Sequence, residues 1–150
     1  MNDTERCATV FGLGRVPYAP GTAASFAALI VAVPVMALLG WVAMAALGIV
    51  AAAFGIWISD HYALDTGVAD PKDCVIDEVA GQWLACAFAP VSFWGFLFAF
   101  LLFRLFDIAK PWPVNKAETL RGGLGIVADD VVAGLMAGVV VYLFAWAGFL

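Results

Sequence analysis

Charged residues are scarce in this chain: 13% of its 150 residues are charged and 65% are hydrophobic. Residues 16–59, 79–103 and 131–150 contain neither a charged residue nor a histidine. About 20 consecutive apolar residues cross the hydrocarbon of a bilayer, so each of these stretches is long enough to do so. The composition excludes an ordinary soluble domain and predicts one integral membrane domain over residues 1–150.

Cysteine, histidine and positive charge are also rare. The three cysteines are an odd number without the spacing of metal ligands, so they are predicted to be reduced packing residues. We assign no role to the single histidine, His61. The net charge of −5 argues against a nucleic-acid partner. The N-terminus lacks the basic segment and short apolar core of a cleaved signal peptide, so the first apolar stretch is expected to remain in the mature protein.

The apolar stretches predict an all-α membrane bundle of about four to five helices. The first stretch is too long for one crossing, and Gly40 offers a turn between helices at 23–39 and 42–59. Pro34 is expected to kink the first of these two helices. The sequence therefore predicts a helical hairpin before residue 60.

The last helix is predicted over residues 129–149. It carries Gly134 and Gly138, a spacing that lets another helix approach closely. That second helix is either a neighbour inside the bundle or a second copy of the chain. The sequence alone sets no oligomeric state.

Residues 79–103 form either one tilted span or a short re-entrant helical hairpin. Pro90 lies at the midpoint, and proline disfavours helix both at its own position and at the residue before it. Lysine and arginine occur in both flanking segments, 60–78 and 104–130, and these residues favour the cytoplasmic side of a membrane. Only an even number of crossings puts both segments on that side, so we expect the chain to reverse at Pro90.

Acidic residues recur where the apolar stretches begin or end. The five are Asp77, Glu78, Asp107, Asp129 and Asp130. Single aspartates at helix starts are ordinary caps. Five carboxylates gathered at one membrane face would repel each other unless a cation neutralised them, and oxygen-only ligands with room for water and phosphate suit Mg²⁺. The pattern therefore predicts a magnesium site, provided that the chain reverses at Pro90.

Two further segments contain candidate phosphate ligands. In the segment 17–25, Gly21, Thr22 and Ser25 precede or open a helix, where Thr22 is a good N-cap and free backbone amides can hold an anion. A plain capped helix start is the simpler interpretation. Arg104 and Lys110 flank Asp107 at helical spacing, either as a surface ion-pair ladder or as phosphate ligands beside a metal-binding aspartate.

Four segments resemble the bacterial phosphatidylglycerophosphatase A family: PYAPGTAAS (17–25), DPKDCVIDEVAGQW (70–83), FRLFDIAKPWPV (103–114) and GGLGIVADDVVAG (122–134). The resemblance implies a multi-pass enzyme of the bacterial inner membrane with its active site facing the cytoplasm. It also implies Mg²⁺-dependent hydrolysis of phosphatidylglycerol phosphate to phosphatidylglycerol and phosphate, a step of phospholipid biosynthesis. The expected partners are this substrate and the membrane lipids.

The resemblance also implies roles for individual residues. The implied catalytic residues are Asp77, Glu78, Asp129 and Asp130, and these four together with Asp107 are the implied metal ligands. The implied phosphate or headgroup contacts are Gly21, Thr22, Ser25, Arg104 and Lys110. The chain departs from the family pattern at Ala24, which precedes Ser25 where the family has glycine, and around residues 60–61.

Other classes of phosphatase have sequence motifs of their own. The chain contains no Cys-x5-Arg segment, no Asp-x-Asp pair and no second histidine, which three other phosphatase chemistries require. A phosphatase that acts on another lipid, such as phosphatidate, remains an alternative. The four segments contain the residues expected to bind metal and phosphate, and they do not specify the lipid headgroup. A small transporter or channel component is the alternative from another class. It predicts acidic residues that face both sides of the membrane or lie within the apolar stretches, and these stretches have none.

Overall fold

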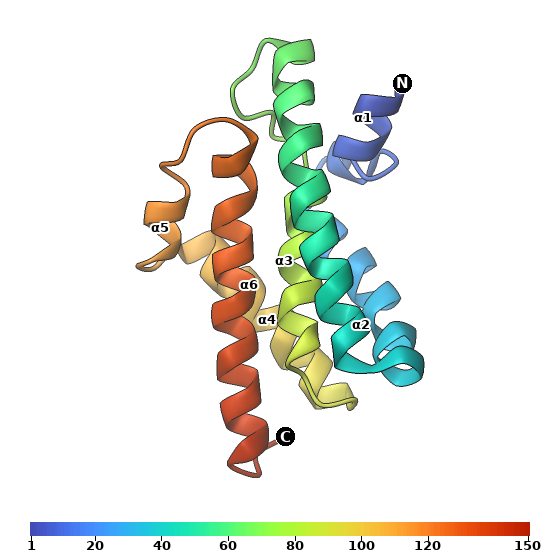
Figure 1. Cartoon of the computed structure of the whole chain (residues 1–150), viewed down its shortest axis with the longest axis vertical. Helices are drawn as coiled ribbons and strands as arrows, with labels where there is room; N and C mark the ends of the chain where they lie inside the picture. The colour runs from blue at the N-terminus through green and yellow to red at the C-terminus, as the bar shows by residue number, and fades with distance from the viewer.

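The computed structural model describes all residues, 1–150, and contains helices but no strands (Figure 1). The elements are α1 (Asp3–Ala8), the 3-10 helix η1 (Leu13–Arg15), α2 (Pro20–Thr66), α3 (Ile76–Ala87), α4 (Phe93–Ala109), α5 (Val114–Ala117) and α6 (Gly123–Trp146). The all-α prediction is confirmed. The set differs from the expected one because the short helices α1 and α5 were not predicted and because both arms of the first hairpin are counted in α2.

Helix α2 is a hairpin of two helical arms. Gly40, with φ 78° and ψ −178°, is its only residue with non-helical dihedral angles, and glycine adopts positive φ without a steric penalty. Figure 1 shows the chain doubling back at this point. The backbone stays helical through Pro34, and the second arm continues past the predicted end at Ser59 to Thr66. The predicted turn at Gly40 is confirmed.

The chain reverses again between α3 and α4. Helix α3 ends at Ala87, and α4 begins after Ser92, whose hydroxyl oxygen accepts a hydrogen bond of 2.9 Å from the Gly95 amide. Helix α4 then runs back along the bundle, so that Arg104 near its end lies 3.9 Å from Glu78 near the start of α3. A single span over 79–103 is excluded, and the predicted hairpin around Pro90 is confirmed.

Helix α6 packs against α3, which also contacts α2. A Cβ atom at Gly134 would overlap the Gly81 carbonyl, and one at Gly138 would lie 2.5 Å from the Phe88 ring. The two glycines therefore let α6 approach α3 inside the bundle, as one of the two alternatives predicted. The buried core beside this contact includes Phe103 and Val141.

Helix α6 begins earlier than predicted, at Gly123, so the predicted start at residue 129 is wrong. The Gly123 amide donates a hydrogen bond to the Asp60 carboxylate, which caps the helix from α2. Asp129 and Asp130 consequently lie in the second turn of α6. The long helices α2 and α6 are each long and apolar enough to cross a membrane.

Candidate active site

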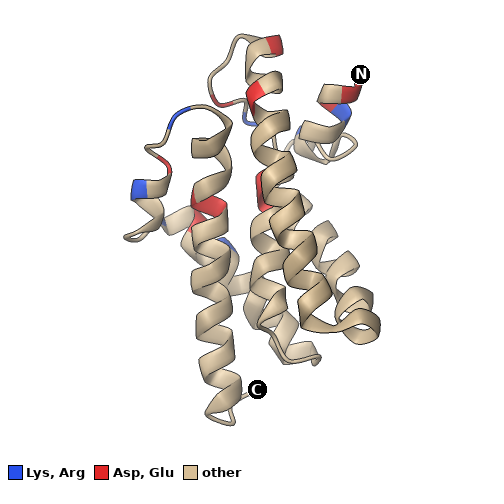
Figure 2. Cartoon of the chain, viewed as in Figure 1, with Lys and Arg blue, Asp and Glu red and all other residues tan.

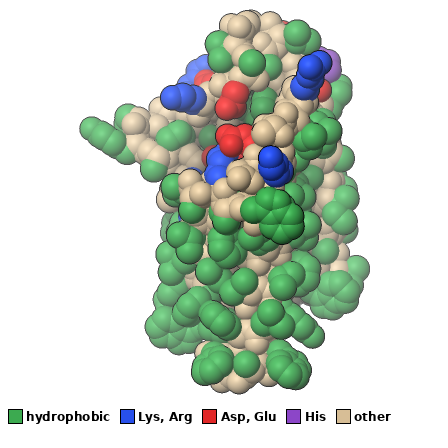
Figure 3. Space-filling view, turned by 90° about the vertical axis from the view of Figure 1, so that its left-hand side faces the viewer, with side chains coloured by type: hydrophobic (Ala, Val, Ile, Leu, Met, Phe, Trp, Pro, Cys, Tyr) green, Lys and Arg blue, Asp and Glu red, His purple; other side chains and the backbone are tan.

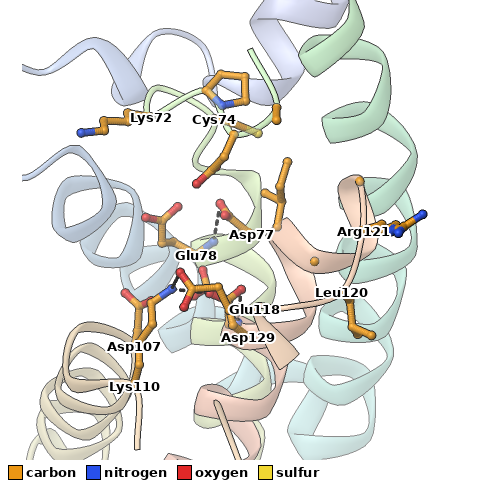
Figure 4. Close-up of a pocket in the computed structure, with 17 residues that line it drawn as sticks. Lys72, Cys74, Asp77, Glu78, Asp107, Lys110, Glu118, Leu120, Arg121 and Asp129 are labelled. Carbon is orange, nitrogen blue, oxygen red and sulfur yellow. Dashed lines mark hydrogen bonds and ion pairs between the residues drawn. The ribbon is translucent and has the colours of Figure 1, made fainter. Parts of the chain in front are cut away.

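A cavity of about 510 Å³ opens near one end of the bundle, between the start of α3, the end of α4 and the first turns of α6. Its lining includes all five predicted acidic residues and Lys110 (Figure 4). The five acidic residues are Asp77, Glu78, Asp107, Asp129 and Asp130. The reversal between α3 and α4 brings them together, since it returns the end of α4 to the start of α3.

The carboxylates form two overlapping groups. Asp77, Glu78 and Asp130 make one, Asp107, Asp129 and Asp130 make the other, and within each group one oxygen per residue lies within 4.8 Å of the others. Asp130 belongs to both groups and is only 3% exposed. Such all-oxygen groups could hold a hard divalent cation.

Both acidic pairs have the same local geometry. The Glu78 amide donates to the Asp77 carboxylate at 3.0 Å, and the Asp130 amide donates to the Asp129 carboxylate at 3.0 Å. Each bond holds the first carboxylate of its pair against the helix backbone. Asp77 and Glu78 also lie in the first turn of α3, where the helix dipole stabilises negative charge.

Two cations neutralise only part of this acidic cluster. Arg104 lies 2.6 Å from Asp107, and Lys110 lies 2.7 Å from both Asp129 and Glu118. Asp77 and Asp130 have no ion pair, and one buried oxygen of Glu78 has no hydrogen-bond partner. The group formed by these three residues therefore has unsatisfied negative charge, which fits a bound cation.

Lys110 ends α4 and turns toward α6. It is the C-cap residue, with φ 47° and ψ 53°. Burial lowers the pKa of its ammonium, but its hydrogen bonds to Asp129 and Glu118 outweigh burial and raise the pKa above its usual value. Lys110 therefore stays charged and fixes the Asp129 carboxylate (Figure 4).

Arg104 lies between the acidic cluster and the start of α2. Its Nη1 donates to the Ser25 hydroxyl at 3.5 Å, and that hydroxyl donates to the Gly21 carbonyl at 2.8 Å. A side chain at Gly21 would overlap the Glu78 carboxylate, so this position needs glycine for close approach. Gly21 and Ser25 therefore border the site, although they do not line the cavity itself.

The predicted N-cap role of Thr22 is wrong. Helix α2 begins at Pro20, and Ala19 is its N-cap residue. Proline is favoured in the first turn because its missing amide has no partner there anyway. The amides of Gly21 and Thr22 donate to no acceptor, so they are free at the helix start beside Arg104.

Several residues of the cavity were not predicted. Glu118 binds Lys110, and Lys72 and Arg121 lie at the margin of the cavity. Cys74 also lines it, and burial raises the pKa of its thiol to about 11, so this residue remains a thiol. Glu118 lies in a charged segment without periodicity, and only the fold of residues 110–122 brings it to Lys110.

All three cysteines are free, as predicted. His61 lies on the exposed surface and bonds only to its own helix, through the Trp57 carbonyl. Its neighbour Asp60 has the structural role of capping α6.

Comparisons with known proteins identify relatives of this chain. A family model described as phosphatidylglycerophosphatase A matches residues 6–145. Phosphatidylglycerophosphatase A of Escherichia coli K12 is 34% identical over 137 residues, which cover 88% of this chain and 77% of the relative. The Haemophilus influenzae protein of the same name is 35% identical over 144 residues, which cover 95% and 88%.

A protein of Bacteroides thetaiotaomicron, provisionally named a phosphatidylinositol-3-phosphatase, is 37% identical over 145 residues, covering 92% of this chain and 91% of the relative. No solved structure matches the chain. The helical fold, the acidic cavity and these matches define a phosphatase with a site that could hold a metal ion. The chain belongs to the phosphatidylglycerophosphatase A family.

Proposed function

We propose that this protein hydrolyses phosphatidylglycerol phosphate to phosphatidylglycerol and phosphate, as a step of phospholipid biosynthesis. The observation that carries the proposal is the group of Asp77, Glu78 and Asp130, which has unsatisfied negative charge beside the Arg104 guanidinium. A site with both a cation-binding and an anion-binding part suits a phosphomonoester. Two of the relatives bear the name of this activity.

The proposed location is the bacterial inner membrane, with several crossings and the active site facing the cytoplasm. Charged residues gather toward one end of the bundle and hydrophobic side chains cover the other (Figures 2 and 3). The most apolar windows of α2 and α6 have mean hydropathies of 2.4 and 2.0. Lysine and arginine lie around the cavity, which favours the cytoplasmic side for this end.

The ion that we propose for the carboxylates is Mg²⁺. All the donors are oxygens, and the acidic residues exceed the nearby cations, which suits a hard divalent ion. When bound, Mg²⁺ would supply positive charge that draws electron density from the phosphate and makes a neighbouring water more acidic. We propose Asp77, Glu78, Asp107 and Asp130 as residues that hold it.

The chain's own residues would perform the remaining steps. Arg104 and the free amides of Gly21 and Thr22 would bind the non-ester oxygens of the phosphate, with Ser25 positioning Arg104. Asp129 belongs to only one of the two carboxylate groups and is fixed by Lys110, so it is the candidate to orient the attacking water and accept its proton. Lys110 would stabilise the charge that develops on the phosphate oxygens.

A substrate comparison tests this proposal. Phosphate release by the purified protein in mixed micelles should be at least about tenfold faster from phosphatidylglycerol phosphate than from phosphatidate or phosphatidylinositol 3-phosphate. The last substrate is included because of the name of the Bacteroides relative. Faster release from either of the other lipids would contradict the proposed headgroup. Ion flux into liposomes without phosphate release would instead support the transporter alternative.

A further inference from the structure

An apolar groove of about 500 Å³ runs between the first arm of α2 and α4. Nine of its ten lining residues are hydrophobic. They include Phe26, Leu29 and Val33 from α2 and Phe93, Leu97 and Phe100 from α4. Phe26 and Phe93 are 54% and 73% exposed, so the groove opens on the surface of the bundle.

The groove leads to the phosphate-binding side of the active site. On α4, Phe93, Leu97, Phe100 and Arg104 follow one another at helical spacing and share a face. On α2, Ser25 directly precedes Phe26 and hydrogen-bonds to Arg104. The polar contact between Arg104 and Ser25 therefore marks one end of the groove.

The length of the groove matches one leaflet of a bilayer. From Arg104 to Phe93 the helix rises about 16 Å at 1.5 Å per residue. One leaflet is half of a hydrocarbon core about 30 Å thick, or about 15 Å. At the far end the groove is bounded by Val91 and Ser92, in the turn between α3 and α4. A lipid whose phosphate lies at Arg104 would thus extend one acyl chain to this turn.

A second apolar pocket, of about 580 Å³, does not have this relation to the site. Its lining includes Gly40 at the turn of the α2 hairpin, Pro90, and Tyr142 near the end of α6. Its lining contains no residue of α4 and none of α2 before Met36, whereas the groove reaches Phe26 and Phe100 near the Arg104–Ser25 contact. The second pocket therefore lies at the end of the bundle away from the cavity.

We propose that the groove between α2 and α4 binds an acyl chain of the lipid substrate and makes turnover depend on chain length. This inference rests on the proposed lipid phosphatase function. It adds a hydrophobic subsite to the polar site, with Arg104 at the boundary between the two. Bulky residues placed in the groove should weaken the binding of long-chain substrates only.

The test compares Val33→Trp with Val31→Trp, two equal changes on the same arm of α2. Val33 lines the groove and is 41% exposed; Val31 does not line it and is 46% exposed. We expect Val33→Trp to raise KM for dipalmitoyl phosphatidylglycerol phosphate at least tenfold and to leave kcat/KM for a soluble dibutyryl analogue unchanged. Tenfold corresponds to about 1.4 kcal/mol.

Val31→Trp should behave as wild type with both substrates. Equal KM values for the two variants, or equal losses on both substrates, would overturn the proposal. Leu97→Trp, on the facing helix, provides the same comparison if Val33→Trp does not fold.

A labelling experiment separates this proposal from the proposed function. Phosphatidate with a photoactivatable group in one acyl chain should label residues 26–33 and 93–101 of the wild-type protein. Labelling spread evenly over exposed apolar positions such as Val139 would overturn the groove assignment. If wild type releases no phosphate from phosphatidylglycerol phosphate, the proposed function fails, and the labelling pattern still decides the groove.

Discussion

Asp130→Asn should lower kcat for phosphatidylglycerol phosphate at least about 10³-fold. Asp130 is the one residue common to both carboxylate groups, and it has no ion pair. The amide has nearly the same shape but removes the charge that would hold the cation. A cation contributes several kcal/mol to stabilising charge on a phosphoryl group, and each 1.36 kcal/mol corresponds to a factor of ten in rate. Phosphate release from mixed micelles measures the effect.

The control for this variant is Asp65→Asn. Asp65 lies on the exposed surface, outside both carboxylate groups. The Asp65→Asn variant removes one carboxylate charge, as Asp130→Asn does, but its kcat should match that of wild type. Asp77→Asn and Glu78→Gln should resemble Asp130→Asn. Wild-type turnover by Asp130→Asn would show that the cluster is not the catalytic centre.

The Asp130→Asn substitution should raise the stability of the metal-free protein although it lowers the activity. In the presence of a chelator, Asp130 is a buried acidic group without a cation partner, and such a group destabilises the fold. Asp130→Asn should therefore unfold at a temperature a few degrees above wild type under these conditions. A general folding defect would instead lower both the activity and the unfolding temperature.

Arg104→Gln should lower kcat about 10²- to 10³-fold, the loss typical of removing one group that stabilises developing charge. Arg104 contacts Asp107 at 2.6 Å and Ser25 at 3.5 Å, and its buried Nε has no partner. The guanidinium is thus held in place beside the acidic cluster, with one buried donor left unpaired. A planar guanidinium can also donate parallel hydrogen bonds to two oxygens of one phosphate group.

Arg104→Lys is the informative second variant. Lysine keeps the positive charge but lacks the planar guanidinium with its two parallel N–H donors. The kcat of this variant should therefore lie between those of Arg104→Gln and wild type. Arg121→Gln is the matched control, since Arg121 lies at the cavity margin but is exposed and should matter little to kcat. Equal losses in Arg104→Gln and Arg121→Gln would indicate a general effect of positive charge.

The two chain reversals could be predicted because their causes are local. Gly40 supplies the positive φ of the first turn. Pro90, with the Ser92 cap two residues later, supplies the second. Once these turns are set, the ends that carry Asp77 and Asp107 must meet, so the gathering of the acidic residues follows from the sequence.

The features that were missed depend on contacts between distant segments. Helix α6 begins within the glycine-rich stretch 122–125, which has the composition of a loop, and Asp60 on α2 supplies the cap for this helix start. The contact of Glu118 with Lys110 likewise depends on the fold of the intervening segment. Thr22 was misassigned because its side chain suits an N-cap, whereas Pro20 starts the helix two residues earlier.

Binding of a divalent ion tests the central claim most directly. Mn²⁺ is a paramagnetic substitute for Mg²⁺, and its binding to the purified protein can be followed by electron paramagnetic resonance. Wild type and Asp65→Asn should bind Mn²⁺ equally and release it to Mg²⁺, whereas Asp130→Asn should bind it at least about tenfold more weakly. Equal Mn²⁺ binding by wild type and Asp130→Asn would contradict a metal site built on these carboxylates.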